Sequence, residues 1–209
     1  MCNRYRSDRS KYPVLAHRLG VGLPFNEISE GPRDIYPDKL ADVVVRSNGG
    51  AELTEMRWGF PPPPNLGTRP VTNVRNLSSS YWRGWLKPEW RCLVPASAFS
   101  EYDERTPKGA KVPRWFGADA PMFCFAGIWR PWIGVRGTRA EQAAMGAVEH
   151  RLFAFLTCAP NAVVAPVHGK AMPVIVPEDR WAEWLDAPVE DAVAMAQPFP
   201  PERMTLLNE

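Results

Sequence analysis

The second residue of the chain is a cysteine that directly follows the initiator methionine. Removal of Met1 would leave a free α-amine and a thiol on Cys2, which together form an aminothiol. These groups have ordinary pKa values of ~8 and ~8.5, so a useful fraction of each is nucleophilic at neutral pH. The amine can condense with an aldehyde to a Schiff base, and the thiolate can then close a thiazolidine ring. A cysteine at position 2 can also be incidental, so the rest of the chain must supply the context.

Basic and aromatic residues are concentrated between Arg57 and Arg91. This window holds six Lys and Arg residues against one acidic residue, whereas the whole chain has a net charge of +2. Cations can follow the phosphates of a nucleic acid, and aromatic rings can stack on unpaired bases. Most of these rings, taken individually, fit a hydrophobic core better, but the window as a whole predicts contact with single-stranded nucleic acid. Its aromatic residues are Trp58, Phe60, Tyr81, Trp82, Trp85 and Trp90.

Two arginines, Arg4 and Arg6, follow Cys2 closely in the sequence. Positive charge beside a thiol favours the thiolate and can hold a phosphate. We therefore expect these cations to support both the nucleophile and nucleic-acid binding.

Six short blocks along the chain form an ordered set that resembles the SOS response-associated peptidase family, also called abasic site processing proteins. No single block is specific, and the resemblance depends on their order over nearly the whole chain. The blocks are MCNRYR at the start, RWGF at 57–60, TNVRN at 72–76, RCLVPASAFSEY at 91–102, LTCAPN at 156–161 and VHGKAMPVIV at 167–176.

This resemblance implies a sensor of abasic sites in single-stranded DNA. After loss of Met1, Cys2 would form a thiazolidine crosslink with the DNA and shield the site from strand cleavage during the SOS response. The implied catalytic residues are Cys2, Asn73, Glu101 and His168. His168 would protonate the sugar ring oxygen, and Glu101 would accept a proton from the α-amine. Asn73 would hold either a sugar hydroxyl or the N-terminal residue.

The resemblance also implies a set of DNA contacts, which are Arg4, Arg57, Trp58, Arg75, Thr157 and Lys170.

The chain departs at one place from the common His-x-Arg-Met-Pro pattern of this family. His168 is followed by Gly-Lys-Ala before Met172 and Pro173, which adds one residue and replaces Arg with Lys.

Two other function classes remain open. Cys2 could be the N-terminal nucleophile of a cysteine peptidase, with its own amine or His168 as base. The chain could instead be a non-catalytic module that binds single strands, in which Cys2 has no role. Self-processing peptidase and lyase activities are also compatible with the crosslinking hypothesis. A peptidase would cleave proteins without DNA, and a binding module would release DNA at high salt.

The elements that must position these residues are short, because 23 prolines interrupt the chain,. Apolar runs predict strands at 42–46, 92–96, 122–129, 152–158 and 173–176,. A helix is predicted after Pro177, with Trp181, Trp184 and Leu185 on one face, and a second one from 188 to about 197,. The segments 61–64 and 103–112 are predicted to be surface loops. Together these elements favour one α+β domain over residues 1–209, a mostly antiparallel sheet folded into an irregular barrel, as the resemblance also implies.

Composition is typical of one globular domain, with 45% hydrophobic and 23% charged residues,. No apolar run approaches the ~20 residues of a membrane span, so we expect a cytoplasmic, monomeric protein without membrane association. Its expected partner is single-stranded DNA with abasic sites, and any replication-fork partner is unknown. The four cysteines have no metal-ligand spacing, and Cys92, Cys124 and Cys158 are expected to be buried,. No metal or organic cofactor is expected.

Overall fold

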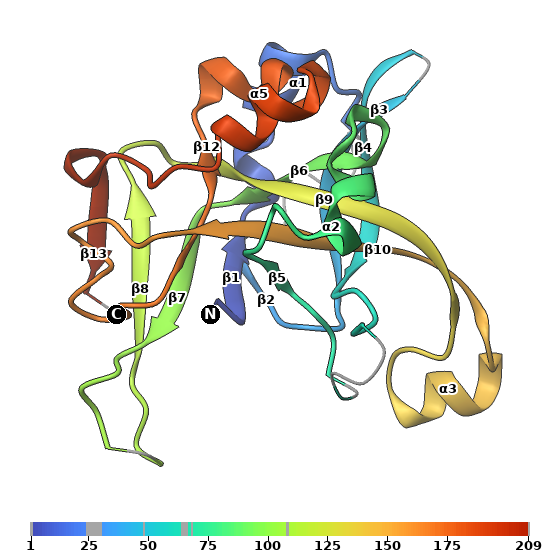
Figure 1. The fold of residues 1–209 in the computed structure, drawn as a ribbon, viewed down its shortest axis with the longest axis horizontal. Coiled ribbons are helices and arrows are strands. Elements are labelled where there is room, and N and C mark those ends of the chain that lie inside the picture. The colour runs from blue at the N-terminus through green and yellow to red at the C-terminus, as the bar shows by residue number, and fades with distance from the viewer. Residues whose placement is uncertain are drawn as a thin grey trace.

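The computed structural model describes residues 2–23, 31–47, 49–63, 67, 69–107 and 109–208. A ring of five strands closes into a barrel at the centre of the molecule (Figure 1), in the order β10–β4–β3–β6–β9 and back to β10. The β10–β4 pair is parallel and the other four pairs are antiparallel. The predicted, mostly antiparallel barrel is thereby confirmed. The strands are β3 (Leu40–Ser47), β4 (Gly50–Trp58), β6 (Arg91–Ala96), β9 (Phe123–Gly134) and β10 (Val148–Cys158).

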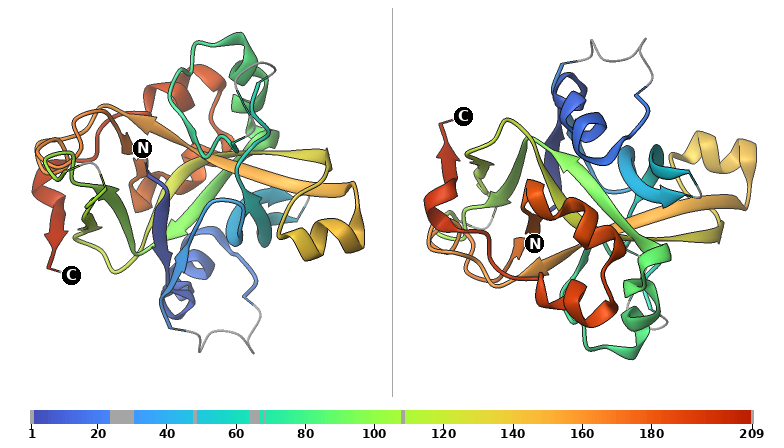
Figure 2. Two further views of the ribbon diagram at one scale, coloured as in Figure 1. Left: turned by 90° about the horizontal axis from the view of Figure 1, so that it is seen from below. Right: turned by 90° about the horizontal axis from the view of Figure 1, so that it is seen from above.

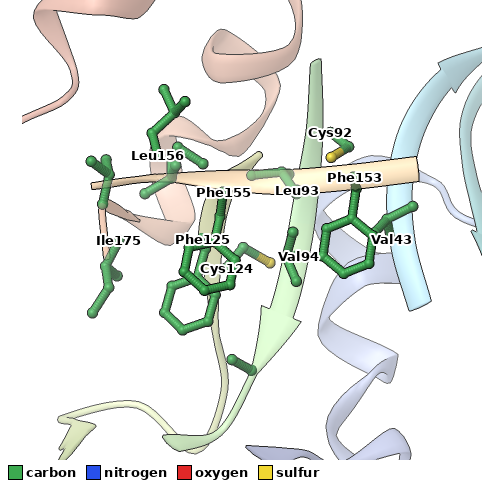
Figure 3. Close-up of a cluster of buried hydrophobic side chains, with 14 of the residues drawn as sticks. Val43, Cys92, Leu93, Val94, Cys124, Phe125, Phe153, Phe155, Leu156 and Ile175 are labelled. Carbon is green, nitrogen blue, oxygen red and sulfur yellow. The ribbon is translucent and has the colours of Figure 1, made fainter. Parts of the chain in front are cut away.

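Aromatic side chains from the neighbouring strands β4, β9 and β10 pack inside the barrel. Phe125 of β9 and Phe155 of β10 are fully buried, with ring centroids 4.8 Å apart, and Figure 3 shows both rings in the central cluster. Trp58 at the end of β4 stacks on Phe155, with centroids 5.1 Å apart, and on Phe153 at 6.4 Å. Burying large rings of this kind is the main favourable contribution to the stability of such a core.

A second, fully antiparallel sheet lies beside the barrel and carries the start of the chain. Its order is β13–β8–β7–β1–β2. Only Ser97 separates β6 of the barrel from β7 of this sheet, so the chain passes directly from one sheet to the other. Tyr5 of β1 packs edge-on against Trp58 and Phe125, which joins the two sheets. The strands are β1 (Arg4–Ser7), β2 (Arg33–Ile35), β7 (Ala98–Tyr102), β8 (Pro113–Ala118) and β13 (Met204–Leu207).

Three two-residue strands extend the barrel sheet. β5 (Asn73–Val74) runs parallel to β10, β11 (Met172–Pro173) pairs with the end of β10, and β12 (Ile175–Val176) pairs with β9. These short strands are important for the site, because they bring residues near 73 and 172 to the C-terminal end of β10.

Short helices surround the barrel. Figure 2 shows α1 (Pro13–Leu19) and α2 (Ser80–Arg83) on opposite sides of it, and α3 (Arg139–Met145) lies at the far end of the β9–β10 hairpin. Trp184 of α4 (Trp181–Asp186) donates a hydrogen bond to the Cys92 carbonyl at 2.9 Å and so fixes that helix to β6. The other helical elements are α5 (Val189–Ala194) and the single-turn 3-10 helices Arg9–Lys11, Gly84–Leu86, Pro88–Trp90, Glu178–Arg180 and Pro201–Arg203.

The structure confirms the predicted elements with adjusted ends. The predicted strands correspond to β3, β6, β9 and β10, whereas 173–176 divides into β11 and β12. The two predicted C-terminal helices are α4 and α5. The sequence analysis did not identify β1, β2, β4, β5, β7, β8 and β13, nor α1, α2 and α3. Residues 61–63 and the described part of 103–112 have no regular structure, as expected, while Pro64 and Lys108 lie outside the described residues.

The three internal cysteines are buried and free, as the apolar runs around them predicted. Within the described ranges, no helix is long and apolar enough to cross a membrane.

Candidate active site

Cys2 lies in a fully buried position just before β1. Its backbone carbonyl accepts a hydrogen bond from Asn73 Nδ2 at 2.8 Å, and its Sγ donates to the Arg4 carbonyl at 3.4 Å. Asn73 is the first residue of β5, and it also donates to Thr72 Oγ1 at 2.8 Å. Because β5 pairs with β10 opposite Phe155, the barrel places this amide where it can hold the start of the chain. Of the two partners considered for Asn73, the N-terminal residue is the one observed.

The environment of Cys2 favours the neutral thiol. Burial raises the pKa of this thiol well above its ordinary range, and the charge of Glu101 raises it further,. As long as Met1 precedes Cys2, the Cys2 nitrogen is part of a peptide bond and is not nucleophilic.

Arg4 and Arg6 do not activate this thiol in the way the sequence suggested. Both guanidinium groups pair with Asp34 of β2, and both lie over the Trp115 ring, with Cζ 4.8 and 4.4 Å from its centroid. A carboxylate and an aromatic face together satisfy the two cations. The expectation that they favour the Cys2 thiolate is wrong, and Arg4 is occupied within the fold.

Glu101 enters the site from β7, the strand that pairs with β1. The register places Ser100 opposite Arg4, which brings the next residue, Glu101, close enough to influence Cys2. The carboxyl group is buried, and this burial raises the pKa of Glu101 to about 7; the positive N-terminal amine opposes the increase, and the charge of Glu104 adds to it,. A carboxyl group with this pKa can both release and accept a proton near neutral pH.

His168 approaches Glu101 from the segment between β10 and β11. Its Nε2 is 3.9 Å from Glu101 Oε2, and its Nδ1 is 3.0 Å from Glu104 Oε1. Asn161 shapes this segment, because its side-chain oxygen accepts hydrogen bonds from the backbone N–H groups of Val163 and Val164. Burial lowers the pKa of His168, so the imidazole is largely neutral near pH 7,.

A cavity of about 700 Å³ opens beside these groups. Glu101 and His168 are in its wall, together with residues of the β7–β8 loop. The volume is sufficient for a sugar and part of a neighbouring nucleotide. Its lining residues are Asn3, Glu101, Tyr102, Asp103, Glu104, Thr106, Lys111, His168 and Lys170.

Two predicted DNA-binding cations flank this cluster. Arg75 follows β5, is exposed, and donates a hydrogen bond to the Lys170 carbonyl. The Lys170 side chain is 75% exposed, with Nζ 3.5 Å from Glu104 Oε1. Burial raises the pKa of Cys158 to about 11, and the positive charge of Arg75 opposes this effect, which places Arg75 close to the end of β10. The two cations therefore stand together at the edge of the site.

Thr157, the residue before Cys158, is buried opposite Pro173 of β11. Its Oγ1 and the Oδ1 of Asn73 are buried atoms with no hydrogen-bond partner among the described residues. Because unsatisfied buried polar atoms destabilise a fold, they commonly mark positions that a ligand or water completes.

Arg57 and Trp58 are structural residues, which corrects their predicted role in DNA binding. Trp58 is fully buried in the barrel and donates from Nε1 to the Thr72 carbonyl at 3.1 Å. Arg57 is also buried and donates from Nη1 to the Asp38 carbonyl at 2.5 Å. A ring enclosed by the core cannot stack on a base, so neither residue is retained among the proposed contacts.

The remaining aromatic residues of the basic window also pack within the protein. Phe60 and Trp82 are buried, and Trp85 and Trp90 are half-buried with ring centroids 5.2 Å apart. Trp90 in turn meets Trp129 of β9 at 5.1 Å. Core packing, the interpretation favoured for most of these rings individually, therefore describes the window better than base stacking does.

The sequence analysis assigned no role to Glu104, but the structure places its carboxylate against His168. The signal that could have found it is weak, because a loop glutamate three residues after Glu101 has no pattern of its own. Among the described residues, no group of three or more His, Cys, Asp and Glu side chains is arranged to hold a metal ion.

Comparisons with known proteins agree with this arrangement. A family model described as SOS response associated peptidase (SRAP) matches residues 1–208. Abasic site processing protein YoqW of Bacillus subtilis (strain 168) is 26% identical over 160 residues, which are 73% of this chain and 66% of YoqW. Abasic site processing protein YobE of the same organism is 24% identical over 160 residues, covering 73% of this chain and 67% of YobE.

Solved structures share the fold. A crystal structure of a Bordetella bronchiseptica protein has a TM-score of 0.75 at 22% identity and covers all of both chains. A Bacteroides thetaiotaomicron protein has a TM-score of 0.72 at 17% identity and covers 98% of this chain and 90% of its own. With the family match extending over nearly its full length, the chain belongs to the SOS response-associated peptidase family.

Proposed function

We propose that this protein processes abasic sites in single-stranded DNA by forming a covalent crosslink through Cys2. The observation that carries the proposal is the convergence of Asn73, Glu101 and His168 on the start of the chain, beside a cavity of about 700 Å³. The names of the relatives YoqW and YobE, both abasic site processing proteins, support the same substrate.

The reaction requires a free α-amine, so Met1 must be removed first. An abasic deoxyribose opens to an aldehyde, and His168, in its imidazolium form, would donate the Nε2 proton to the ring oxygen as the ring opens. The Cys2 nitrogen then attacks C1′, and loss of water gives a Schiff base. The Cys2 sulfur adds to C1′, while the thiol proton is transferred to the nitrogen, which closes the thiazolidine. The aldehyde is consumed, so it no longer promotes strand cleavage by β-elimination.

Glu101 suits the proton transfers of this sequence. With a pKa raised to about 7 by burial, it can take a proton from the ammonium group and return one to the departing hydroxyl. Asn73 holds the Cys2 carbonyl, which limits the orientations of both nucleophiles. Holding reacting groups in this way raises their effective concentration without a cofactor.

Phosphates next to the abasic sugar have two cations available at the edge of the site, Arg75 and Lys170. Arg75 can bind a phosphate with a planar pair of N–H donors, whereas Lys170 acts as a point charge. The hydroxyl of Thr157 and the side-chain oxygen of Asn73 would gain partners from the bound sugar or its water. This polar surface is compatible with a flexible single strand that presents its sugar outward.

A second activity of the same residues is self-removal of Met1. The Cys2 side chain is adjacent to the Met1–Cys2 peptide bond by covalent structure, and Glu101 supplies a nearby proton donor and acceptor. Mass spectrometry of the chain purified without a host methionine aminopeptidase tests this step. Loss of Met1 in the wild type but not in Cys2→Ala would support self-processing.

The central experiment compares crosslinking of wild type and Cys2→Ala to a single strand with one abasic site. A denaturing gel should show a heat-stable adduct for wild type alone. When a methionine aminopeptidase has removed Met1, Cys2→Ala retains an α-amine at residue 2, so it should give an adduct only after borohydride trapping. The same strand with a tetrahydrofuran residue in place of the abasic sugar lacks the aldehyde and serves as the control. A heat-stable crosslink of full yield from Cys2→Ala would refute the mechanism.

A further inference from the structure

We propose that Glu104 is a positioning residue that holds the His168 imidazole with Nδ1 protonated and Nε2 directed to Glu101 and the cavity. The effect of Glu104 on the rate of crosslinking rests on the proposed function, whereas its effect on the orientation and tautomer of His168 does not. Glu104 belongs to the loop between β7 and β8, outside the segment that contains His168.

The geometry distinguishes the two ring nitrogens. Glu104 Oε1 is 3.0 Å from Nδ1, within hydrogen-bond distance, whereas Glu101 Oε2 is 3.9 Å from Nε2, which leaves a gap,. A carboxylate accepts hydrogen bonds, so its short contact with Nδ1 requires that nitrogen to carry a proton. In the neutral imidazole the lone pair is then on Nε2, the nitrogen that faces Glu101.

Glu104 is itself held in place. Its backbone N–H donates to the Val167 carbonyl at 2.9 Å, which ties the loop to the residue before His168. Lys170 Nζ lies 3.5 Å from the same carboxylate oxygen that meets Nδ1. The backbone hydrogen bond and the contact with Lys170 together hold the Glu104 carboxylate in place. The carboxylate can therefore hold the His168 ring in one orientation.

The two carboxyl groups around His168 differ in their surroundings. Glu101 is buried, and its pKa is raised to about 7, so its charge changes near neutral pH. The Glu104 side chain is 41% exposed; burial opposes its ionisation, but the charges of His168 and Lys170 outweigh this effect and lower its pKa. Glu104 therefore presents a lasting negative charge to one side of the ring, while Glu101 exchanges protons on the other.

The first test needs no DNA and is independent of the proposed function. NMR titration of the wild type and of Glu104→Gln measures the pKa and tautomer of each histidine. Loss of the Glu104 charge should lower the pKa of His168, because a nearby anion favours the imidazolium. His17 and His150 are the internal controls and should not move. The charged groups to consider around His168 are Glu101 of β7, Glu104 of the following loop, Lys170 of its own segment and the N-terminal amine, whose positive charge lowers the pKa of His168.

Glu104→Ala extends this test, because it removes the acceptor as well as the charge. His168 should lose its preference for the Nδ1-protonated tautomer in this variant, whereas the amide oxygen of Glu104→Gln can still accept from Nδ1. An unchanged pKa and tautomer of His168 in both variants would overturn the proposal. Glu52→Gln, a substitution of an exposed glutamate on β4, is the matched control for a general loss of one negative charge.

The second test measures crosslinking rates at saturating abasic DNA. Glu104→Ala should react about 10-fold more slowly, an effect typical of a residue that orients a functional histidine. His168→Gln should lose about 100-fold, as expected for a general acid or base. In the double variant, Glu104→Ala should add nothing to the loss caused by His168→Gln, because it acts through that ring. A fully additive loss in a correctly folded double variant would overturn the proposed route.

Discussion

The site cluster, formed by Cys2, Asn73, Glu101, Thr157 and His168, and the basic aromatic window both contain buried side chains, but burial has opposite meanings in the two regions. In the cluster, burial acts on polar groups: it raises the pKa of Cys2 and Glu101 and leaves Thr157 Oγ1 without a partner among the described residues. In the window, burial encloses rings such as Trp58 and Phe60, which gain stability there. A buried polar group is informative about function, whereas a buried aromatic ring usually is not.

This contrast changes how the sequence of the window is interpreted. Its local charge pattern was typical of a single-strand binding surface, yet most of its rings contact other rings of the protein. The cation of the window that we propose as a phosphate contact is Arg75, which differs from Arg57 in being exposed at the edge of the site. The composition of a window of about 35 residues cannot predict which of these two arginines is exposed, because the two side chains are chemically identical and differ only in where the fold places them.

The largest effect that tests this contrast is expected from Trp58→Ala. Removing a fully buried indole leaves a cavity against Phe153 and Phe155, so the free energy of unfolding should fall by about 3–5 kcal/mol. Chemical denaturation measures this loss, and Trp58→Phe should lose less because it fills part of the cavity. Weakened DNA binding by a Trp58→Ala protein of wild-type stability would instead return this ring to the interface.

A smaller effect, on rate and not on folding, is expected from Glu101→Gln. Removing the proton acceptor should slow crosslinking about 100-fold while binding of the abasic strand changes little. In the wild type, the rate should rise as the pH passes through about 7, the pKa of Glu101, because the carboxylate is the form that accepts the proton. In single-turnover measurements, the crosslinking rate of Glu101→Gln should not show this rise with pH.

The same substitution has a consequence for stability whose sign follows from the pKa. The folded-state pKa of Glu101, about 7, lies above its ordinary value of 4.5, so the folded protein binds the additional proton between these pH values. The free energy of unfolding contributed by this group therefore falls as the pH rises through that interval. Relative to the wild type, Glu101→Gln should therefore become more stable as the pH rises. The opposite trend would contradict this prediction, because it would mean that folding favours the ionised form of Glu101.

The smallest effect is expected from Arg75→Ala. Loss of one phosphate contact should weaken binding of single-stranded DNA about 10-fold, equally for intact and abasic strands. The slope of the logarithm of the binding constant against the logarithm of the salt concentration should become shallower by about one. Fluorescence anisotropy at several salt concentrations measures both quantities. Arg57→Ala is the matched control: it should leave the salt slope unchanged and reduce stability, because its guanidinium is buried against the Asp38 carbonyl. Equal slopes for Arg75→Ala and the wild type would remove Arg75 from the interface.

Much of the barrel could be predicted because its strands carry strong local signals. β6 after Arg91, and β10 from residue 152 to its end, are largely apolar runs with both faces buried. β4 and β8 were missed because polar and charged residues interrupt them, and only pairing with neighbours makes them strands. Their pairing is a non-local property, which local propensity does not contain.

For the site, the sequence by itself determined the chemical groups: an aminothiol precursor at Cys2, a carboxyl at Glu101 and an imidazole at His168. Only the tertiary structure decided which groups meet. Closure of the barrel brings Asn73 to Cys2, and the loop after β7 brings Glu104 to His168. The tertiary structure also decided that Trp58 faces inward. Alternate residues of a strand point to opposite sides, and only the closed barrel defines which side is the core.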